Sequence, residues 1–227
     1  MSASATRPTP PDDGAFPSIA ERIAGPGWAI QEGFVAPETC LALAALLQAR
    51  HDAGLFRPAG IGRGPRPKLR PQVRSDLVHW IEDACPPTPL QHCLDRLEAL
   101  RQSLNRTLFA GLTELETHLT LYPRGAFYAP HLDQFATTTR RRLSVVLYLN
   151  RHWRRPDGGL LRLWTDPSTH THRPQPDAPW IEVLPEAGTL VVFRSADFWH
   201  EVRRARRTRL SLTGWFLVAP DPNALVL

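Results

Sequence analysis

The chain has 227 residues and a mass of 25.5 kDa, and its 42% hydrophobic and 22% charged residues are typical of a folded globular protein rather than a fibrous or disordered one. No stretch approaches the roughly 20 apolar residues of a membrane span, and Met1–Asp12 lacks the apolar segment of a signal peptide. We therefore expect a cytoplasmic protein that does not associate with membranes. The excess of 27 Lys+Arg over 22 Asp+Glu is compatible with an acidic partner.

Helical patterns are confined to the first half of the chain. We predict a mobile tail over Met1–Phe16 and a single domain over 17–227, which begins with a strand over Trp28–Val35. A helix is expected from Pro37 to the Gly at position 54, and a second from about Pro89 until Gly111, because apolar residues recur there at a spacing of three or four.

From about residue 112 the apolar period changes from 3.6 to 2. Six short runs rich in β-branched or aromatic residues, separated by Gly, Pro, Asp and Ser, read as strands: Leu115–Tyr122, Leu143–Leu149, Leu160–Trp164, Trp180–Leu184, Thr189–Phe193 and Leu210–Val218. We predict an α+β fold in which an N-terminal helical support to about residue 111 packs on one face of a jelly roll over about 112–220.

Three residues on this β scaffold form a candidate metal site. His131 and Asp133 are two residues apart, so an extended chain points both side chains to the same side. His200 follows the apolar strand Thr189–Phe193. Two imidazoles and one carboxylate form the facial triad that is diagnostic of non-haem Fe(II) oxygenases.

Arg209 and Tyr148 complete this hypothesis. A facial triad leaves three iron positions open, of which a 2-oxo acid could fill two and dioxygen the third. The far carboxylate of such a co-substrate needs a cation, and Arg209, nine residues after His200, can grip it with two hydrogen bonds. The hydroxyl of Tyr148 is a second candidate donor.

The order of these motifs resembles the prolyl 4-hydroxylase superfamily of 2-oxoglutarate oxygenases, and most closely the branch of hypoxia-type prolyl hydroxylase domains and their bacterial relatives. The resemblance covers about residues 25–220. It is carried by these segments: His51–Phe56, Val73–Glu82, His131-Leu-Asp133, Tyr148-Leu-Asn150, Gly158–Leu163, His200-Glu-Val202 with Arg209, and Thr213–Phe216.

The resemblance implies a double-stranded β-helix fold and a role for each matched residue. His131, Asp133 and His200 would bind Fe(II), while Arg209 and Tyr148 would hold the C5 carboxylate of 2-oxoglutarate. The remaining matched residues would line the cavity: Tyr122 and Thr213 near the co-substrate and metal, and Tyr128 and Trp215 around the target proline.

The activity implied is hydroxylation of a prolyl residue at C4 in a protein substrate, coupled to decarboxylation of 2-oxoglutarate to succinate. Dioxygen would be the oxidant and ascorbate (vitamin C) the reductant. Bacterial relatives of this branch are associated with translation proteins, notably elongation factor Tu, so a partner of that kind is expected.

Two other functions stay open from the sequence. The same chemistry could act on a free amino acid or a nucleic-acid base, or the chain could be a jelly-roll binding module without catalysis. The arginine runs Arg140–Arg142 and Arg203–Arg209 would suit phosphate binding. We interpret them instead as charges that protect sheet edges from strand pairing, and we expect no nucleic-acid partner.

Overall fold

The computed structural model describes residues 13–61, 68–134, 140–167 and 173–220. Its helical elements are η1 (Asp13–Ala15), α1 (Phe16–Ala24), α2 (Pro37–Asp52), α3 (Thr88–Leu108) and η2 (Arg155–Asp157). Its strands are β1 (Trp28–Gln31), β2 (Arg57–Pro58), β3 (Leu77–Trp80), β4 (Leu112–Tyr122), β5 (Tyr128–His131), β6 (Arg141–Tyr148), β7 (Leu161–Trp164), β8 (Trp180–Val183), β9 (Leu190–Arg194), β10 (His200–Val202) and β11 (Arg209–Val218).

The strands form two antiparallel sheets that face each other. The larger sheet has the order β1-β9-β6-β11-β4-β3-β2, and the smaller has the order β5-β10-β7-β8. From β4 onward the chain passes back and forth between the sheets: β4, β6, β9 and β11 lie in the larger sheet, and β5, β7, β8 and β10 in the smaller. This arrangement is the predicted double-stranded β-helix, with the predicted helices packed against it.

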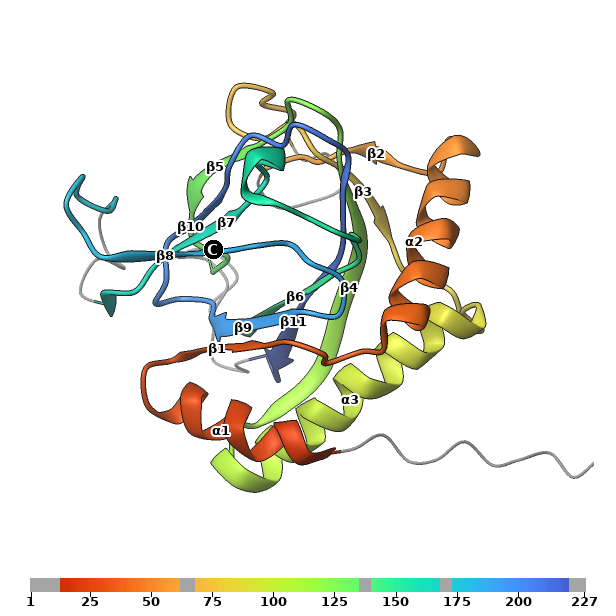
Figure 1. Cartoon of the computed structure of the whole chain (residues 1–227). Helices are drawn as coiled ribbons and strands as arrows, with labels where there is room; N and C mark the ends of the chain where they lie inside the picture. Colours follow the sequence, from red (N-terminus) through yellow and green to blue (C-terminus); the bar gives the residue numbers. More distant parts are fainter. Residues whose placement is uncertain (1–12, 62–67, 135–139, 168–172, 221–227) are drawn as a thin grey trace, which may run out of the picture.

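The helices cover the outer face of the larger sheet, as Figure 1 shows for α1, α2 and α3. One apolar core joins them to that sheet and includes Leu43 and Leu47 of α2, Leu97 and Leu100 of α3, and Leu119 of β4. A second core lies between the two sheets. The helical half therefore supports one wall of the jelly roll and leaves the space between the sheets for a site.

The predicted tail is wrong at its C-terminal end. Asp13–Ala15 form a turn of 3-10 helix, and Phe16 begins α1, where its side chain is buried with its ring 6.2 Å from that of Phe34. Phe16, Ile19 and Ile23 lie on one face of this short helix, which explains its burial against the core. Residues 1–12 of the predicted tail lie outside the described residues.

Several strand boundaries also differ from the sequence prediction. The strand predicted over Trp28–Val35 ends at Gln31, because residues 32–36 turn toward α2. Four strands were not predicted: β2, β3, β5 and β10, each of at most four residues.

Within the described ranges, no helix combines the length and apolar character required to cross a bilayer.

Candidate active site

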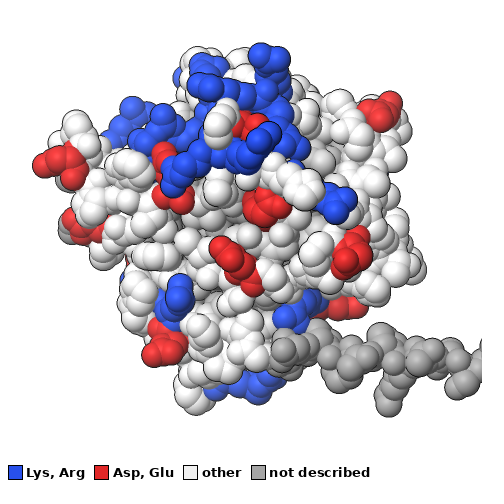
Figure 2. Space-filling view, viewed as in Figure 1, with Lys and Arg blue, Asp and Glu red and all other residues white. Residues whose placement is uncertain are grey.

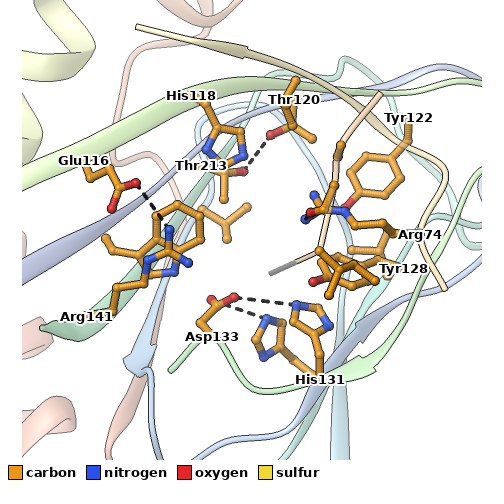
Figure 3. A pocket seen from close by; sticks show the side chains of 18 of the residues that line it. Arg74, Glu116, His118, Thr120, Tyr122, Tyr128, His131, Asp133, Arg141 and Thr213 are labelled. Carbon is orange, nitrogen blue, oxygen red and sulfur yellow. Dashed lines mark hydrogen bonds and ion pairs between the residues drawn. The ribbon is translucent and has the colours of Figure 1, made fainter. Parts of the chain in front are cut away.

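A cavity of about 570 Å³ lies between the two sheets and collects most of the residues singled out from the sequence. The larger sheet lines it with residues of β3, β4, β6 and β11, and the smaller sheet with residues of β5, β7 and β10. Figure 3 shows His131 and Asp133 on one side of this cavity and His118, Thr120 and Thr213 on the opposite side. Its volume suits a small organic ligand together with one side chain of a larger substrate.

The three predicted metal ligands converge at one point of the cavity wall. His131 ends β5 and lies opposite His200 of β10 in the antiparallel register, while Asp133 follows in the next turn. Asp133 Oδ1 lies 3.6 Å from Nε2 of His131, and Oδ2 lies 3.5 Å from Nε2 of His200. One ligand atom from each residue lies within 4.8 Å of the other two.

Backbone carbonyls orient both imidazoles toward this point. Nδ1 of His131 donates a hydrogen bond to the Ala129 carbonyl at 2.8 Å, and Nδ1 of His200 donates one to the Phe198 carbonyl at 3.2 Å. A neutral imidazole that donates through Nδ1 carries its free lone pair on Nε2. Both Nε2 atoms therefore face Asp133 as electron-pair donors, the arrangement seen in histidines that bind metals.

The charge states around this point favour a cation. Burial and the neighbouring His200 lower the pKa of His131 to about 4, so its ring is neutral at pH 7. Burial alone would raise the pKa of Asp133, but the attraction and hydrogen bonds that its carboxylate gains when His200 or His131 carries a proton hold that pKa well below its usual range, so it is ionised. Lone pairs and a carboxylate so close together repel one another unless a positive charge lies between them, so this donor set fits a divalent metal ion.

A pair of buried serines holds the carboxylate. Ser144 of β6 donates a hydrogen bond of 2.7 Å to Oδ2 of Asp133, and its own oxygen lies 2.9 Å from the hydroxyl of Ser195. Because the single hydroxyl hydrogen of Ser144 is used on Asp133, Ser195 must be the donor in this second contact. The chain of hydroxyls fixes the orientation of Asp133 from behind.

Arg209 is a buried cation without a counter-charge. Only 1% of its surface is exposed, and no acidic side chain among the described residues forms an ion pair with it. Its Nε donates to the Gly159 carbonyl at 2.9 Å, and its guanidinium lies 4.9 Å from the ring centres of both Tyr122 and Tyr148. Burying an unpaired guanidinium is costly, so the residue fits a site that receives an anion from the cavity.

The structure places Tyr122 and Tyr148 beside Arg209, and Thr213 farther along β11, opposite His118. Tyr122 and Thr213 line the cavity, whereas Tyr148 lies behind Arg209 and is not part of the lining. The hydroxyl of Tyr148 is buried with no hydrogen-bond partner among the described residues, and burial raises its pKa to about 12. A protonated, unpaired hydroxyl beside an unpaired guanidinium forms a matched pair of donors for one carboxylate.

Aromatic side chains line two further parts of the cavity. Tyr128 stacks on His131 with 3.5 Å between ring centres, and Trp215 of β11 stacks on His118 of β4 at 5.4 Å. Trp80 packs on the same imidazole at 4.8 Å. Tyr128 therefore offers a flat wall beside one candidate metal ligand, and Trp215 and Trp80 offer flat surfaces beside His118.

Glu116, His118 and Arg141 are among the lining residues that were not assigned to the site from the sequence. His118 is 3% exposed, and its Nδ1 has no hydrogen-bond partner among the described residues. Arg141 lies with its guanidinium 3.4 Å from the ring centre of Trp215 and forms an ion pair with Glu116 at 3.3 Å. The alternation of side chains along β4 could have indicated His118, because it lies on the same face of the strand as Tyr122, four residues later.

Arg74 and Asp76 form a buried ion pair next to this aromatic wall. Two hydrogen bonds of 2.8 and 2.6 Å join the side chains, and Asp76 is 1% exposed. The guanidinium of Arg74 lies 4.1 Å from the ring centre of Tyr128, which in turn stacks on His131. The pair therefore supports the position of a candidate metal ligand through one intervening ring.

Comparisons with known proteins agree with this geometry. A family model described as the 2OG-Fe(II) oxygenase superfamily matches residues 117–217. Egl nine homolog 1 of Rattus norvegicus is 24% identical over 95% of this chain, and the chain spans 62% of that relative's length. The chain spans about half the length of the human Egl nine homolog 1.

Two solved structures resemble the chain over nearly its whole length. A prolyl hydroxylase from Trichoplax adhaerens, solved with a peptide fragment of hypoxia inducible factor, shares the fold at 20% identity and a TM-score of 0.77, over 90% of each chain. A Pseudomonas putida prolyl-4-hydroxylase is 37% identical, with a TM-score of 0.78 over 89% of this chain and 99% of its own. The chain therefore belongs to the prolyl 4-hydroxylase family within the 2OG-Fe(II) oxygenase superfamily.

Proposed function

We propose that this protein is an Fe(II)- and 2-oxoglutarate-dependent dioxygenase that hydroxylates a prolyl residue at C4 in a protein substrate. The observation that carries the proposal is that one cavity contains both a convergent His-Asp-His donor set and a buried, unpaired arginine. The 37% identity to a Pseudomonas putida prolyl-4-hydroxylase supports the choice of proline as the target.

In this proposal His131, Asp133 and His200 hold the iron. Bound iron and 2-oxoglutarate supply an oxidation in which dioxygen is consumed, 2-oxoglutarate loses CO₂ to become succinate, and the substrate gains one hydroxyl group. The protein's own part is to keep both Nε2 lone pairs free and Asp133 ionised. The carbonyls of Ala129 and Phe198 and the hydroxyl of Ser144 do this through the hydrogen bonds described above.

Arg209 and Tyr148 hold the C5 carboxylate of 2-oxoglutarate. The hydrogen bond from Nε of Arg209 to the Gly159 carbonyl fixes the plane of the guanidinium, so that its terminal nitrogens are available to the ligand. Tyr122 lines the same end, while Thr213 lines the cavity farther along β11, where its hydroxyl accepts a hydrogen bond of 3.2 Å from Thr120. Together these groups give the co-substrate one orientation relative to the metal ligands.

Tyr128 and Trp215 receive the target proline. A pyrrolidine ring is apolar and flat enough to pack against aromatic faces; Tyr128 lines the cavity against His131, and Trp215 lines it beside His118. Placing the ring there brings the carbon to be oxidised near the three metal ligands, which is the positioning that the reaction needs.

The proposal extends to partners and conditions. The substrate is a protein, and a translation protein such as elongation factor Tu is the candidate we favour from the family resemblance. Ascorbate serves as the reductant that keeps iron in the ferrous state. We assign the enzyme to the cytoplasm, which the free thiols of Cys40, Cys85 and Cys93 support.

The test is conversion of 2-oxoglutarate to succinate by the purified protein with Fe(II) and ascorbate, in the presence and absence of a lysate of its host. We expect the lysate to stimulate turnover and mass spectrometry to find a peptide whose proline has gained one oxygen atom. Stimulation by a free amino acid or by oligonucleotides alone would transfer the same chemistry to another substrate. Iron binding without any turnover would instead favour a binding module.

A further inference from the structure

Two loops at one end of the jelly roll carry a net positive charge larger than that of the whole chain. The segments 151–157 and 203–207 contain seven arginines and one aspartate, a formal charge of +6, whereas the entire chain has a net charge of +5. We call these seven residues the arginine surface: Arg151, Arg154, Arg155, Arg203, Arg204, Arg206 and Arg207. All seven are exposed, and Figure 2 shows Lys and Arg gathered at the top of the molecule, where η2 lies in Figure 1.

From the sequence alone we expected Arg203–Arg207 to protect a sheet edge. This expectation is wrong, because the arginine surface does not lie on an edge strand. The first loop connects β6 to β7 and the second connects β10 to β11, and each of these four strands is hydrogen-bonded to a neighbour on both sides. The edge strands are β1 and β2 of the larger sheet and β5 and β8 of the smaller. The charges of these two loops therefore need another explanation.

The backbones of the two loops are tied together. Gly158 and Ala205 form an isolated β-bridge, the Arg206 amide donates to the Asp157 carbonyl at 2.7 Å, and the Gly159 amide donates to the Arg204 carbonyl at 3.0 Å. Buried Trp153 and Ala205 anchor the loops to the body of the protein. Like charges are thus held side by side at a fixed spacing, which costs free energy unless an anion binds.

A hollow of about 310 Å³ opens between the loops, lined by Arg155, Arg203, Arg204 and Arg206 together with Glu182. Glu182 accepts hydrogen bonds from Arg155 at 3.1 Å and from Arg162 at 3.0 Å, and lies 3.4 Å from Arg203. These arginines already grip a carboxylate. The side chains of Arg151 and Arg206 have neither a hydrogen bond nor an ion pair within the described part of the chain, so they are free for a partner.

We propose that the arginine surface docks an acidic segment of the protein substrate, rich in Asp and Glu, at a distance from the proline cavity. Guanidinium groups can bind carboxylates in a planar, two-point geometry, as Arg74 does with Asp76 elsewhere in this structure, and Arg155 and Arg203 of the arginine surface already contact the carboxylate of Glu182. Single-stranded nucleic acid would in addition need aromatic rings for its bases, but Trp153, the only Trp, Tyr or Phe on the two loops, is 4% exposed beneath Arg207. This inference rests on the proposed function in one respect only: it identifies the acidic partner with the protein that is hydroxylated.

The test uses two probes of equal length, fluorescein-labelled poly-L-glutamate and oligouridylate, titrated with the full chain at low and at physiological salt without iron or 2-oxoglutarate. The test variant is Arg151→Glu with Arg206→Glu. The matched control is Arg22→Glu with Arg106→Glu, exposed arginines on α1 and α3 that change the net charge equally. Thermal melts of both variants verify that they fold.

We expect poly-L-glutamate to bind the wild-type chain more weakly as salt rises, to bind the test variant roughly ten-fold more weakly, and to bind the control nearly as well as wild type. Equal losses in the two variants, or no binding, would overturn the proposal. Tighter binding of oligouridylate than of poly-L-glutamate would also overturn it, in favour of a nucleic-acid surface. Because the assay involves no turnover, a negative result would not contradict the proposed reaction. Likewise, failure to detect hydroxylation would not contradict binding of poly-L-glutamate to the arginine surface.

Discussion

Arg209 gives the most direct evidence for a ligand site, because its charged side chain is buried beside the cavity. A guanidinium that is 1% exposed, with no acidic partner in the described structure, is stabilised only by two tyrosine rings and the Gly159 carbonyl. Such a group is destabilising in an empty protein and becomes favourable when a carboxylate enters. The buried hydroxyl of Tyr148 adds a second unused donor at the same place.

Replacing Arg209 by Ala is therefore expected to raise the KM for 2-oxoglutarate by roughly 10- to 100-fold, because a charge-assisted hydrogen bond contributes about 1.5–3 kcal/mol. Steady-state kinetics at varied 2-oxoglutarate measures this. Arg106→Ala, an exposed arginine on α3, is the control and should leave the KM unchanged. If Arg209→Ala also leaves it unchanged, the anion site lies elsewhere in the cavity.

His118 makes the stability of the metal-free protein depend on pH. Burial lowers its pKa to about 3, with a smaller contribution from the positive charges of Arg74 and Arg141. In the unfolded chain a histidine titrates near 6.5, so below that pH the unfolded state binds a proton that the native state does not. The free energy of unfolding should fall by about 1.4 kcal/mol for each pH unit below 6.5, until the native pKa is reached.

Urea unfolding of the wild type and of His118→Leu tests this. Leu removes the titrating group and fills similar space, so between pH 7 and pH 5 the wild type should lose about 2 kcal/mol more stability than the variant. His131, whose pKa is also lowered, contributes in the same direction to both proteins and cancels in the comparison. An equal loss in the two proteins would mean that His118 is not held neutral by burial.

The residues of the site differ in how well the sequence predicted them. The positions of His131, Asp133, His200 and Arg209 in one cavity followed from a motif whose order and spacing are specific. Ser144 was not predicted, because its contact with Asp133 depends on the pairing of β6 with β9, which brings Ser195 beside it. Contacts that come from strand pairing between distant segments leave no local pattern in the sequence.

At the scale of elements, the turn that follows η2 is the most constrained part of the site. Gly158 and Gly159 both have positive φ, and a Cβ on Gly158 would clash with the Arg204 carbonyl oxygen. The carbonyl of the next residue, Gly159, accepts the hydrogen bond that holds Arg209. The sequence indicated a turn here, whereas its contact with the β10–β11 loop appeared only in the structure.

Gly158→Ala should therefore destabilise the protein more than Gly111→Ala does. The two glycines have the same φ of +65°, but nothing lies within 4 Å of a Cβ at Gly111. Gly111→Ala should cost about 1–2 kcal/mol from the left-handed backbone alone, and Gly158→Ala should cost at least twice that because the bridge to Ala205 must open as well. Thermal or urea unfolding measures both, and equal losses would show that the loops separate easily.

The N-terminal helix α1 shows why one element was missed. It has only nine residues, begins without a side-chain cap, and follows a tail rich in Pro, Ser and Thr. Propensity alone does not stabilise so short a helix, which forms because Phe16, Ile19 and Ile23 pack on the shared core. The longer helices α2 and α3 were predicted, because their apolar spacing extends over four turns or more.

For the molecule as a whole, the sequence predicted that helices of the N-terminal half pack against a jelly roll formed by the C-terminal half. It did not predict how the strands alternate between two sheets, since β9 pairs with β1 and β6, and β10 with β5 and β7. That alternation creates the cavity between the sheets and the arginine surface at one of its ends. It also places a candidate peptide cavity and a candidate acidic-segment dock on the same double-stranded β-helix.

The most direct test of the central claim is the fate of isotopically labelled dioxygen in a reaction with Fe(II), 2-oxoglutarate and the peptide recovered from the host lysate. The account predicts one labelled oxygen atom in hydroxyproline and the other in succinate. With Asp133→Ala it predicts loss of iron binding and of both labelled products, while Asp95→Ala, an exposed carboxylate on α3, behaves as wild type. Hydroxyproline whose oxygen comes from water, or labelled products formed by Asp133→Ala, would contradict it.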